Sequence, residues 1–196
     1  MKFYPGAYTE IPSDTMFFVT CTVVDWVDVF TREKYRHIII DSLDYCRKKK
    51  GLMIHAWVLM TNHIHLIVSH EYGKDRLAKV IADFKKFTSK AIIRCIKENY
   101  DEESRREWIL VHFISHSDGN KIHFWQNGYY PYEITNIKHL RQKIDYLHEN
   151  PVRAGFVRHP GDFKYSSYSN YCGEQSEIEI DIVDLGLTNP SQYRRW

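Results

Sequence analysis

The sequence predicts an α+β fold, in which helices cover one face of an antiparallel sheet and a further helix is added at the C-terminal end. Three runs rich in aliphatic and β-branched residues have the length and composition of strands: 16–24, 52–59 and 63–69. Two longer segments with apolar residues at helical spacing follow the first and third of these runs: 31–50 and 75–98. With a fourth strand within 123–134, the order becomes βαββαβ followed by a helix, which is a ferredoxin-like arrangement.

The elements of the first half are well delimited. Residues 1–14 contain two prolines and a glycine and are expected to form a polar arm. The run 16–24 is apolar nearly throughout, so we expect a central strand that is buried on both faces. The helix 31–50 ends in four basic residues before Gly51, which suits either a solvated helix C-terminus or a phosphate-binding role. A tight turn at 60–62 makes an antiparallel hairpin of the next two strands.

The second half is less regular. Residues 100–123 are expected to be an insertion with a short helix and a flexible tip. A helix is predicted from about residue 137 to residue 150, capped by Thr135 or Asn136 and ended by Pro151. We expect one domain over residues 1–171 and a tail over 172–196, with a strand or short helix near 178–185.

Composition excludes few classes of function. The chain has 196 residues, 43% of them hydrophobic, and a net charge of only +2, so bulk charge does not indicate a nucleic-acid partner. No apolar run approaches the ~20 residues that span a bilayer, and no signal peptide is recognisable. The four cysteines are scattered without C-x-x-C spacing, which favours reduced thiols and a cytoplasmic protein without membrane contact.

The most informative stretch is 59–68, which contains His63 and His65. Side chains alternate between the two faces of a strand, so these imidazoles share one face and lie about 7 Å apart. Such a pair can bind one divalent metal ion. The alternative is a pair of half-exposed histidines on the sheet surface.

A tyrosine in the last predicted helix departs from its pattern. Ile137, Leu140, Ile144 and Leu147 form the apolar stripe at helical spacing: Tyr146 lies well away from it. This phenol is either a partly exposed packing residue or one presented for chemistry. Asn150 follows one helical turn later, as a polar partner of the same patch or as a helix cap.

Two motifs together resemble a known family. Thr-Asn-His-Ile-His-Leu-Ile at 61–67 and Asp-Tyr-Leu-His-Glu-Asn-Pro-Val-Arg-Ala-Gly at 145–155 are similar to motifs of the single-tyrosine transposases of the HUH endonuclease superfamily, in the branch of REP-associated tyrosine transposases. The segments 84–89, 124–126 and 165–167 support the resemblance, which covers roughly residues 16–171.

The resemblance implies a function and a site. It makes Tyr146 the nucleophile and His63, His65 and Asn150 the ligands of Mg²⁺ or Mn²⁺. The implied reaction is cleavage of single-stranded DNA, which leaves a 5′-phosphotyrosine and a free 3′-OH that can later reverse the attack. The implied partner is hairpin-containing single-stranded DNA, bound by a monomer or a homodimer.

The remaining predictions concern DNA contacts and alternatives. Five basic residues are predicted to hold DNA, unless they are merely solvated: Lys86, Lys90, Arg94, Lys143 and Arg153. The tyrosine-rich segment 129–133 offers a neighbouring phenol as another nucleophile. The alternatives are a non-catalytic single-stranded nucleic-acid-binding protein, a metal-dependent hydrolase with a third histidine ligand, and a structural interaction protein.

Overall fold

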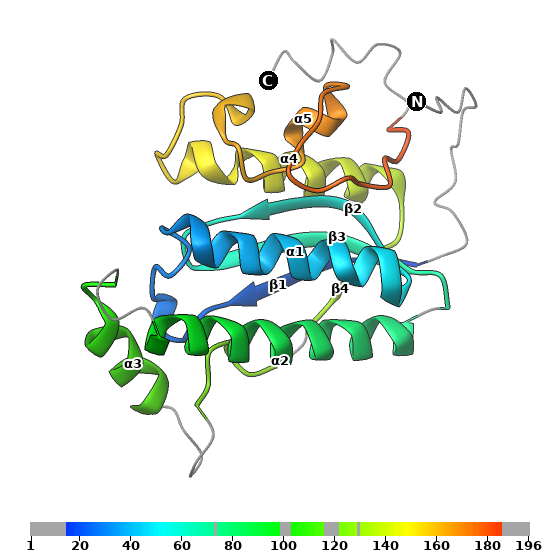
Figure 1. Cartoon of the computed structure of the whole chain (residues 1–196). Helices are drawn as coiled ribbons and strands as arrows, with labels where there is room; N and C mark the ends of the chain where they lie inside the picture. Colours follow the sequence, from blue (N-terminus) through cyan, green and yellow to red (C-terminus); the bar gives the residue numbers. More distant parts are fainter. Residues whose placement is uncertain (1–14, 73, 99–102, 116–121, 129, 186–196) are drawn as a thin grey trace.

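The computed structural model describes residues 15–72, 74–98, 103–115, 122–128 and 130–185 (Figure 1). The strands are β1 (Met16–Thr22), β2 (Leu52–Leu59), β3 (His63–His70) and β4 (Tyr132–Ile134). The helices are α1 (Glu33–Lys50), α2 (Lys74–Glu98), α3 (Arg106–Ser115), α4 (Ile137–Arg153) and α5 (Tyr168–Tyr171), with 3₁₀ turns η1 (Val24–Trp26) and η2 (Pro160–Asp162). The predicted α+β fold is confirmed.

The four strands form one antiparallel sheet in the order β2-β3-β1-β4. The hairpin of β2 and β3 has the predicted limits to within one residue. β1 lies between β3 and β4, and its register places Thr20 opposite His65 and Thr22 opposite His63. The predicted central position of the first strand is therefore correct, but its predicted burial on both faces is wrong at Thr20, which is exposed, and at Phe18, which is half-buried.

Helices lie on both sides of this sheet (Figure 1). α1 and α2 pack side by side on one face, over Phe17, Val19 and Cys21 of β1. The opposite face holds a second, smaller core, in which α4 packs chiefly against β2 and β3. The added C-terminal helix thus closes part of the face that α1 and α2 leave free.

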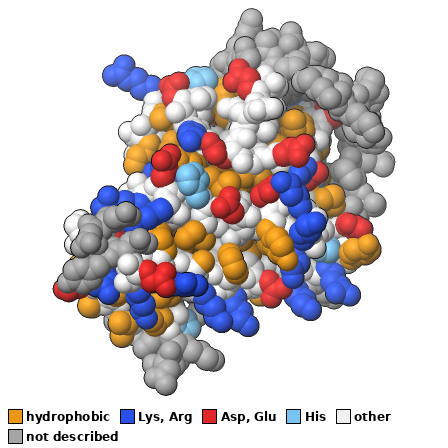
Figure 2. Space-filling view, viewed as in Figure 1, with side chains coloured by type: hydrophobic (Ala, Val, Ile, Leu, Met, Phe, Trp, Pro, Cys, Tyr) orange, Lys and Arg blue, Asp and Glu red, His pale blue; other side chains and the backbone are white. Residues whose placement is uncertain are grey.

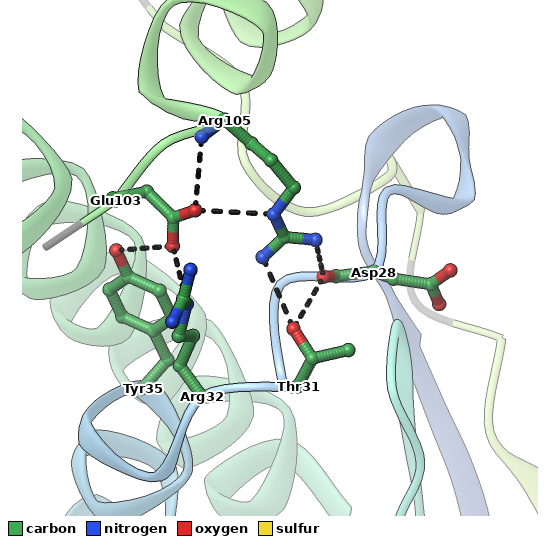
Figure 3. A network of polar contacts seen from close by, with 6 residues as sticks. All are labelled: Asp28, Thr31, Arg32, Tyr35, Glu103 and Arg105. Atoms are coloured by element: carbon green, nitrogen blue, oxygen red, sulfur yellow. Dashed lines mark hydrogen bonds and ion pairs between the residues drawn. The ribbon is translucent and has the colours of Figure 1, made fainter.

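The predicted insertion contains a short helix, α3, which is anchored to the core by Ile109 and Phe113. Its predicted tip lies outside the described residues. A buried carboxylate, Glu103, precedes α3 and accepts hydrogen bonds from the Tyr35 hydroxyl and from Arg105 Nε, both at 3.2 Å (Figure 3). Burial acts to raise the pKa of Glu103, but the hydrogen bond from Arg105 and the neighbouring cations outweigh it and hold that pKa below its usual range.

Two predictions about elements are wrong, and a third element is shorter than expected. The fourth strand lies within the predicted range but is only Tyr132–Ile134, with an isolated bridge from Trp125 to Val23, because the turn at Gly128 and the missing N–H of Pro131 interrupt the pairing. Pro151 does not end α4. It lies buried two residues before the end of the helix, where the N–H that it lacks costs one hydrogen bond, and the helix continues to Arg153.

The segment 178–185 forms neither the strand nor the helix that we expected. It runs irregularly along β2 and buries Ile178, Ile180 and Leu185. Its backbone bonds to the strand directly, since the N–H of Asp181 donates to the carbonyl of Ile54 at 2.7 Å. None of the described helices is both long and apolar enough to cross a bilayer. All four cysteines are free thiols, as predicted.

Candidate active site

The two predicted histidines lie on one face at the start of β3, with ring centroids 4.7 Å apart. α4 brings Tyr146 to the same place, with its ring centroid 5.6 Å from that of His65. The stripe of α4 that includes Leu140 and Leu147 packs on the sheet, and the adjacent stripe therefore projects Tyr146 over the histidines. The tyrosine is 39% exposed and remains accessible.

Two residues of β1 complete the floor of this site, and sequence reasoning missed both. Phe18 stacks on His65 with ring centroids 5.2 Å apart, and the Thr20 hydroxyl lies 2.8 Å from His65 Nδ1. They occupy alternate positions of the strand and therefore share its face with the histidines. That alternation is visible in the sequence, whereas the register that sets Thr20 opposite His65 is not.

The side chain of Asn62 determines which nitrogen of His63 carries its hydrogen. The Asn62 amide nitrogen donates to the carbonyl of Trp26 at 3.1 Å and to the Asp28 carboxylate at 2.9 Å. Two acceptors on this side leave the amide oxygen facing His63 Nδ1, at 2.7 Å. His63 Nδ1 must therefore donate, and the lone pair of the neutral ring is on Nε2, where it can bind a metal ion.

Burial is the main cause that keeps both imidazoles neutral. Burial, His63 and Lys143 lower the pKa of His65 to about 3. Burial also lowers the pKa of His63, although the carboxylate of Asp28 opposes the shift. Neutral imidazole is the form that coordinates metal ions, so this pair is ready to do so at neutral pH.

Asn150 lies one helical turn beyond Tyr146 and is half-buried. Its side-chain nitrogen is buried and has no hydrogen-bond partner among the described residues. The interpretation of Asn150 as the helix cap is wrong, because the cap of α4 is Ala154. Two imidazoles and an amide oxygen would form a donor set that suits Mg²⁺ or Mn²⁺, and the binding of one ion by all three residues stays a prediction. The described residues contain no group of three His, Cys, Asp or Glu side chains that could hold a metal ion.

The predicted DNA-contacting residues fall on two surfaces. Lys143 Nζ lies 5.9 Å and the Arg153 guanidinium 5.3 Å from the centroid of the Tyr146 ring. The other three, Lys86, Lys90 and Arg94, lie on α2, which packs on the opposite face of the sheet. Figure 2, viewed from the side of α1 and α2, shows lysine and arginine side chains there among acidic and apolar ones. Arg94 is paired with Glu98 at 2.8 Å.

The neighbouring phenols of the tyrosine-rich segment are placed differently from Tyr146. Tyr132 is half-exposed, and its ring lies 4.7 Å from Lys143 Nζ. Tyr130 is almost fully exposed, and Tyr129 lies outside the described residues. In the described part of the chain, the aromatic rings in contact with His65 are those of Phe18, His63 and Tyr146.

Comparison with known proteins supports the resemblance seen in the motifs. The chain is 27% identical over 133 residues to a REP-associated tyrosine transposase of Escherichia coli K12, an alignment that covers 68% of this chain and 62% of that protein. It is 28% identical over 114 residues to a putative REP-associated tyrosine transposase of Haemophilus influenzae, covering 58% of this chain and 57% of that one. The chain thus spans about three fifths of the length of these relatives.

A solved structure has the same fold. The structure of a REP-associated tyrosine transposase bound to a REP hairpin matches with a TM-score of 0.57 and 23% sequence identity, over 94% of each chain. Models of known protein families give no match. The resemblance to REP-associated tyrosine transposases is confirmed by the two relatives, and the fold by this structure.

Proposed function

We propose that this chain is a transposase-like, metal-dependent endonuclease and strand transferase that acts on single-stranded DNA through a covalent bond to Tyr146. The observation that supports the proposal best is the position of the accessible Tyr146. Its ring centroid lies 5.6 Å from that of His65, which forms a pair of neutral imidazoles with His63. The resemblance to REP-associated tyrosine transposases adds to it. Because the structural relative is bound to a REP hairpin, we propose hairpin-containing single-stranded DNA as the substrate.

The side chains of the site suit attack on a phosphodiester. A phenol with an ordinary pKa of ~10 is a weak nucleophile at neutral pH, so the site must stabilise the charge that develops on the phosphate. Lys143 and Arg153 bring two positive charges to the ring of Tyr146. His63, His65 and Asn150 would hold Mg²⁺ or Mn²⁺, which when bound polarises a phosphoryl oxygen.

The reaction conserves the energy of the phosphodiester bond. The phenolic oxygen of Tyr146 forms a bond to phosphorus while the bond from phosphorus to the 3′ oxygen breaks. The phenolic proton is released, and the departing 3′ oxygen takes up a proton to become a free hydroxyl. Because one phosphodiester replaces another, a 3′-OH can attack the phosphotyrosine and join two strands without ATP.

The decisive experiment is a search for the covalent adduct. The purified protein is incubated with Mn²⁺ and a panel of end-labelled single-stranded hairpin oligonucleotides, and the products are separated by denaturing electrophoresis. We expect a labelled protein band with the unaltered chain, no such band with Tyr146→Phe, and similar DNA binding by both. Tyr132→Phe is the matched control and should still form the adduct. Full nicking by the Tyr146→Phe protein would exclude the proposed nucleophile, and binding without any adduct would favour a non-catalytic binding protein.

A further inference from the structure

A large aromatic side chain lies exposed beside the histidine pair. Trp26, in η1, is 57% exposed, and its ring centroid is 5.6 Å from that of His63. The rings of Tyr146, His65, His63 and Trp26 therefore follow one another, each 4.7 to 5.6 Å from the next. The indole lies at the end of this row that is farthest from the nucleophile.

The backbone that carries this indole is strained. Asp25 and Trp26 have φ angles of 53° and 55°, in the left-handed region that side chains other than glycine rarely adopt. Such residues persist only where the surroundings impose the conformation, and they concentrate at functional sites. An exposed indole in a strained turn contributes little to folding, so its place beside the histidines calls for another explanation.

Hydrogen bonds from the histidine motif impose this conformation. Asn62 donates from its side chain to the carbonyl of Trp26, and its own carbonyl accepts from the N–H of Val23 at 2.8 Å. Because the same Asn62 side chain contacts His63, one residue sets the positions of both the imidazole and the indole.

A second anchor lies at the far end of the same loop. Arg105 donates to the carbonyl of Asp28 at 3.0 Å and to the Thr31 hydroxyl at 3.1 Å, and Glu103 holds the guanidinium in place (Figure 3). The loop that carries Trp26 is thus fastened to the turn before β3 and to the start of α3. A side chain presented in this way loses little conformational entropy when it binds a ligand.

We propose that Trp26 is a stacking platform for a nucleobase next to the phosphate that Tyr146 attacks, an inference that rests on the proposed function. A phosphate between Tyr146 and the histidine pair places the next nucleotide within reach of the indole. Aromatic side chains bind single strands by stacking on bases of any type, whereas basic side chains such as Lys143 and Arg153 bind chiefly to phosphates. Trp26 therefore supplies affinity that requires a base to be present, and the basic residues supply affinity that an abasic strand would retain.

The test separates bases from phosphates. Binding is measured by fluorescence anisotropy with labelled oligothymidylate and with an abasic strand of the same number of phosphates. Every protein carries Tyr146→Phe, so that no strand is cleaved. We expect Trp26→Ala to weaken binding of oligothymidylate by about 5- to 150-fold, the usual range for loss of one stacked base, and to leave binding of the abasic strand unchanged. Trp26→Phe should keep most of the affinity.

Two further variants test whether a loss of affinity comes from a change in stability or from the removal of any exposed ring. Trp26→Gly removes the ring but suits the left-handed backbone, so it should be at least as stable as the parent and still lose the base-dependent affinity. Tyr45→Ala removes a ring of similar exposure, 55%, from α1 on the other side of the sheet, and should change neither affinity.

Equal loss of affinity for both strands in the Trp26 variants, or no loss for either, would overturn the proposal. Failure of the proposed function looks different, because it is the absence of the covalent adduct with the unaltered chain. Base-dependent binding through Trp26 without an adduct would leave the stacking site standing and remove the cleavage reaction. An adduct together with unchanged binding by the Trp26 variants would support the cleavage reaction and exclude the stacking site.

Discussion

The two faces of the sheet differ in how completely they are covered, and β1 shows the difference along its length. On the face toward α1 and α2, Phe17, Val19 and Cys21 are each only 2% exposed. On the face toward α4, Met16 is buried, Phe18 is half-buried and Thr20 is exposed. One face is thus a continuous core, whereas the other is open at Phe18 and Thr20, beside His65, and is buried again at Thr22.

The number of helices explains this difference. A helix with its side chains is about 10–12 Å wide, and strands are about 4.8 Å apart, so one helix covers about two strands. Two long helices close the first face, whereas on the second face α4 is the one long helix among the described residues and covers chiefly β2 and β3, with Tyr168 and Leu185 in the same core. The strip that remains is where the polar groups lie, and α4 borders it with Tyr146. Stability and chemistry are therefore divided between adjacent stripes of one helix.

The largest difference between the buried stripe of α4, which contains Leu147, and the adjacent stripe, which contains Tyr146, should be in their effect on stability. Leu147 lies on the sheet-facing side of α4 and is fully buried, and Leu147→Ala should lower the free energy of unfolding by about 2–5 kcal/mol. Tyr146→Phe, at the adjacent position, should change it by less than about 0.5 kcal/mol, because the ring is partly exposed and keeps its size. Denaturant unfolding of both variants measures the difference. Similar losses at the two positions would mean that the stripes are not separate.

Metal binding should depend on the residues around the uncovered part of the sheet and not on the closed face. We expect His65→Ala and Asn150→Ala to lose metal-dependent cleavage, with partial recovery at raised Mn²⁺. Asn62→Ala should weaken Mn²⁺ binding by about 10- to 100-fold, because Asn62 orients His63 and sets the position of its hydrogen. Calorimetric titration with Mn²⁺ measures affinity directly, and long-range ¹H–¹⁵N spectra report which His63 nitrogen is protonated. An unchanged affinity in the Asn62 variant would show that His63 needs no such support.

The buried stripe of α4 should make stability depend on pH. Burial lowers the pKa of His148 to about 3, and its Nε2 lies 2.7 Å from the Ser167 hydroxyl. Between pH 6.5 and pH 3 the unfolded chain binds more protons at this residue than the folded chain does, so stability falls as the pH falls. His148→Gln should remove up to about 1.4 kcal/mol per pH unit from this slope. Thermal unfolding across this interval measures it, and an unaltered slope would contradict the prediction.

The smallest expected effect concerns salt. Lys143→Ala and Arg153→Ala should each reduce the slope of log affinity against log salt by about 0.7 for a single-stranded oligonucleotide, since each removes one of the proposed phosphate contacts. Lys86 and Lys90 are also predicted to bind DNA, but they lie on the closed side of the sheet. We therefore expect their alanine variants to change the slope less. Equal changes at all four positions would indicate that the strand wraps around both faces.

Several features could be predicted because they depend on neighbours in sequence. The hairpin of β2 and β3, the two long helices and the off-stripe position of Tyr146 all follow from local periodicity. Errors arose where contacts with distant segments override a local signal. Pro151 remains in α4, where its ring is buried, and the segment 178–185 has no regular structure because its backbone bonds to β2.

The sequence by itself determined which side chains share a face of each element, because the periods of strand and helix are properties of the local chain. It therefore placed His63 with His65, and Tyr146 apart from the stripe of Leu147. Only the tertiary structure decided which faces meet: Thr20 opposite His65, Tyr146 over the histidines, and Trp26 beside His63. The reason is physical, since these contacts are set by the packing of segments far apart in sequence, and no local period records how such segments align.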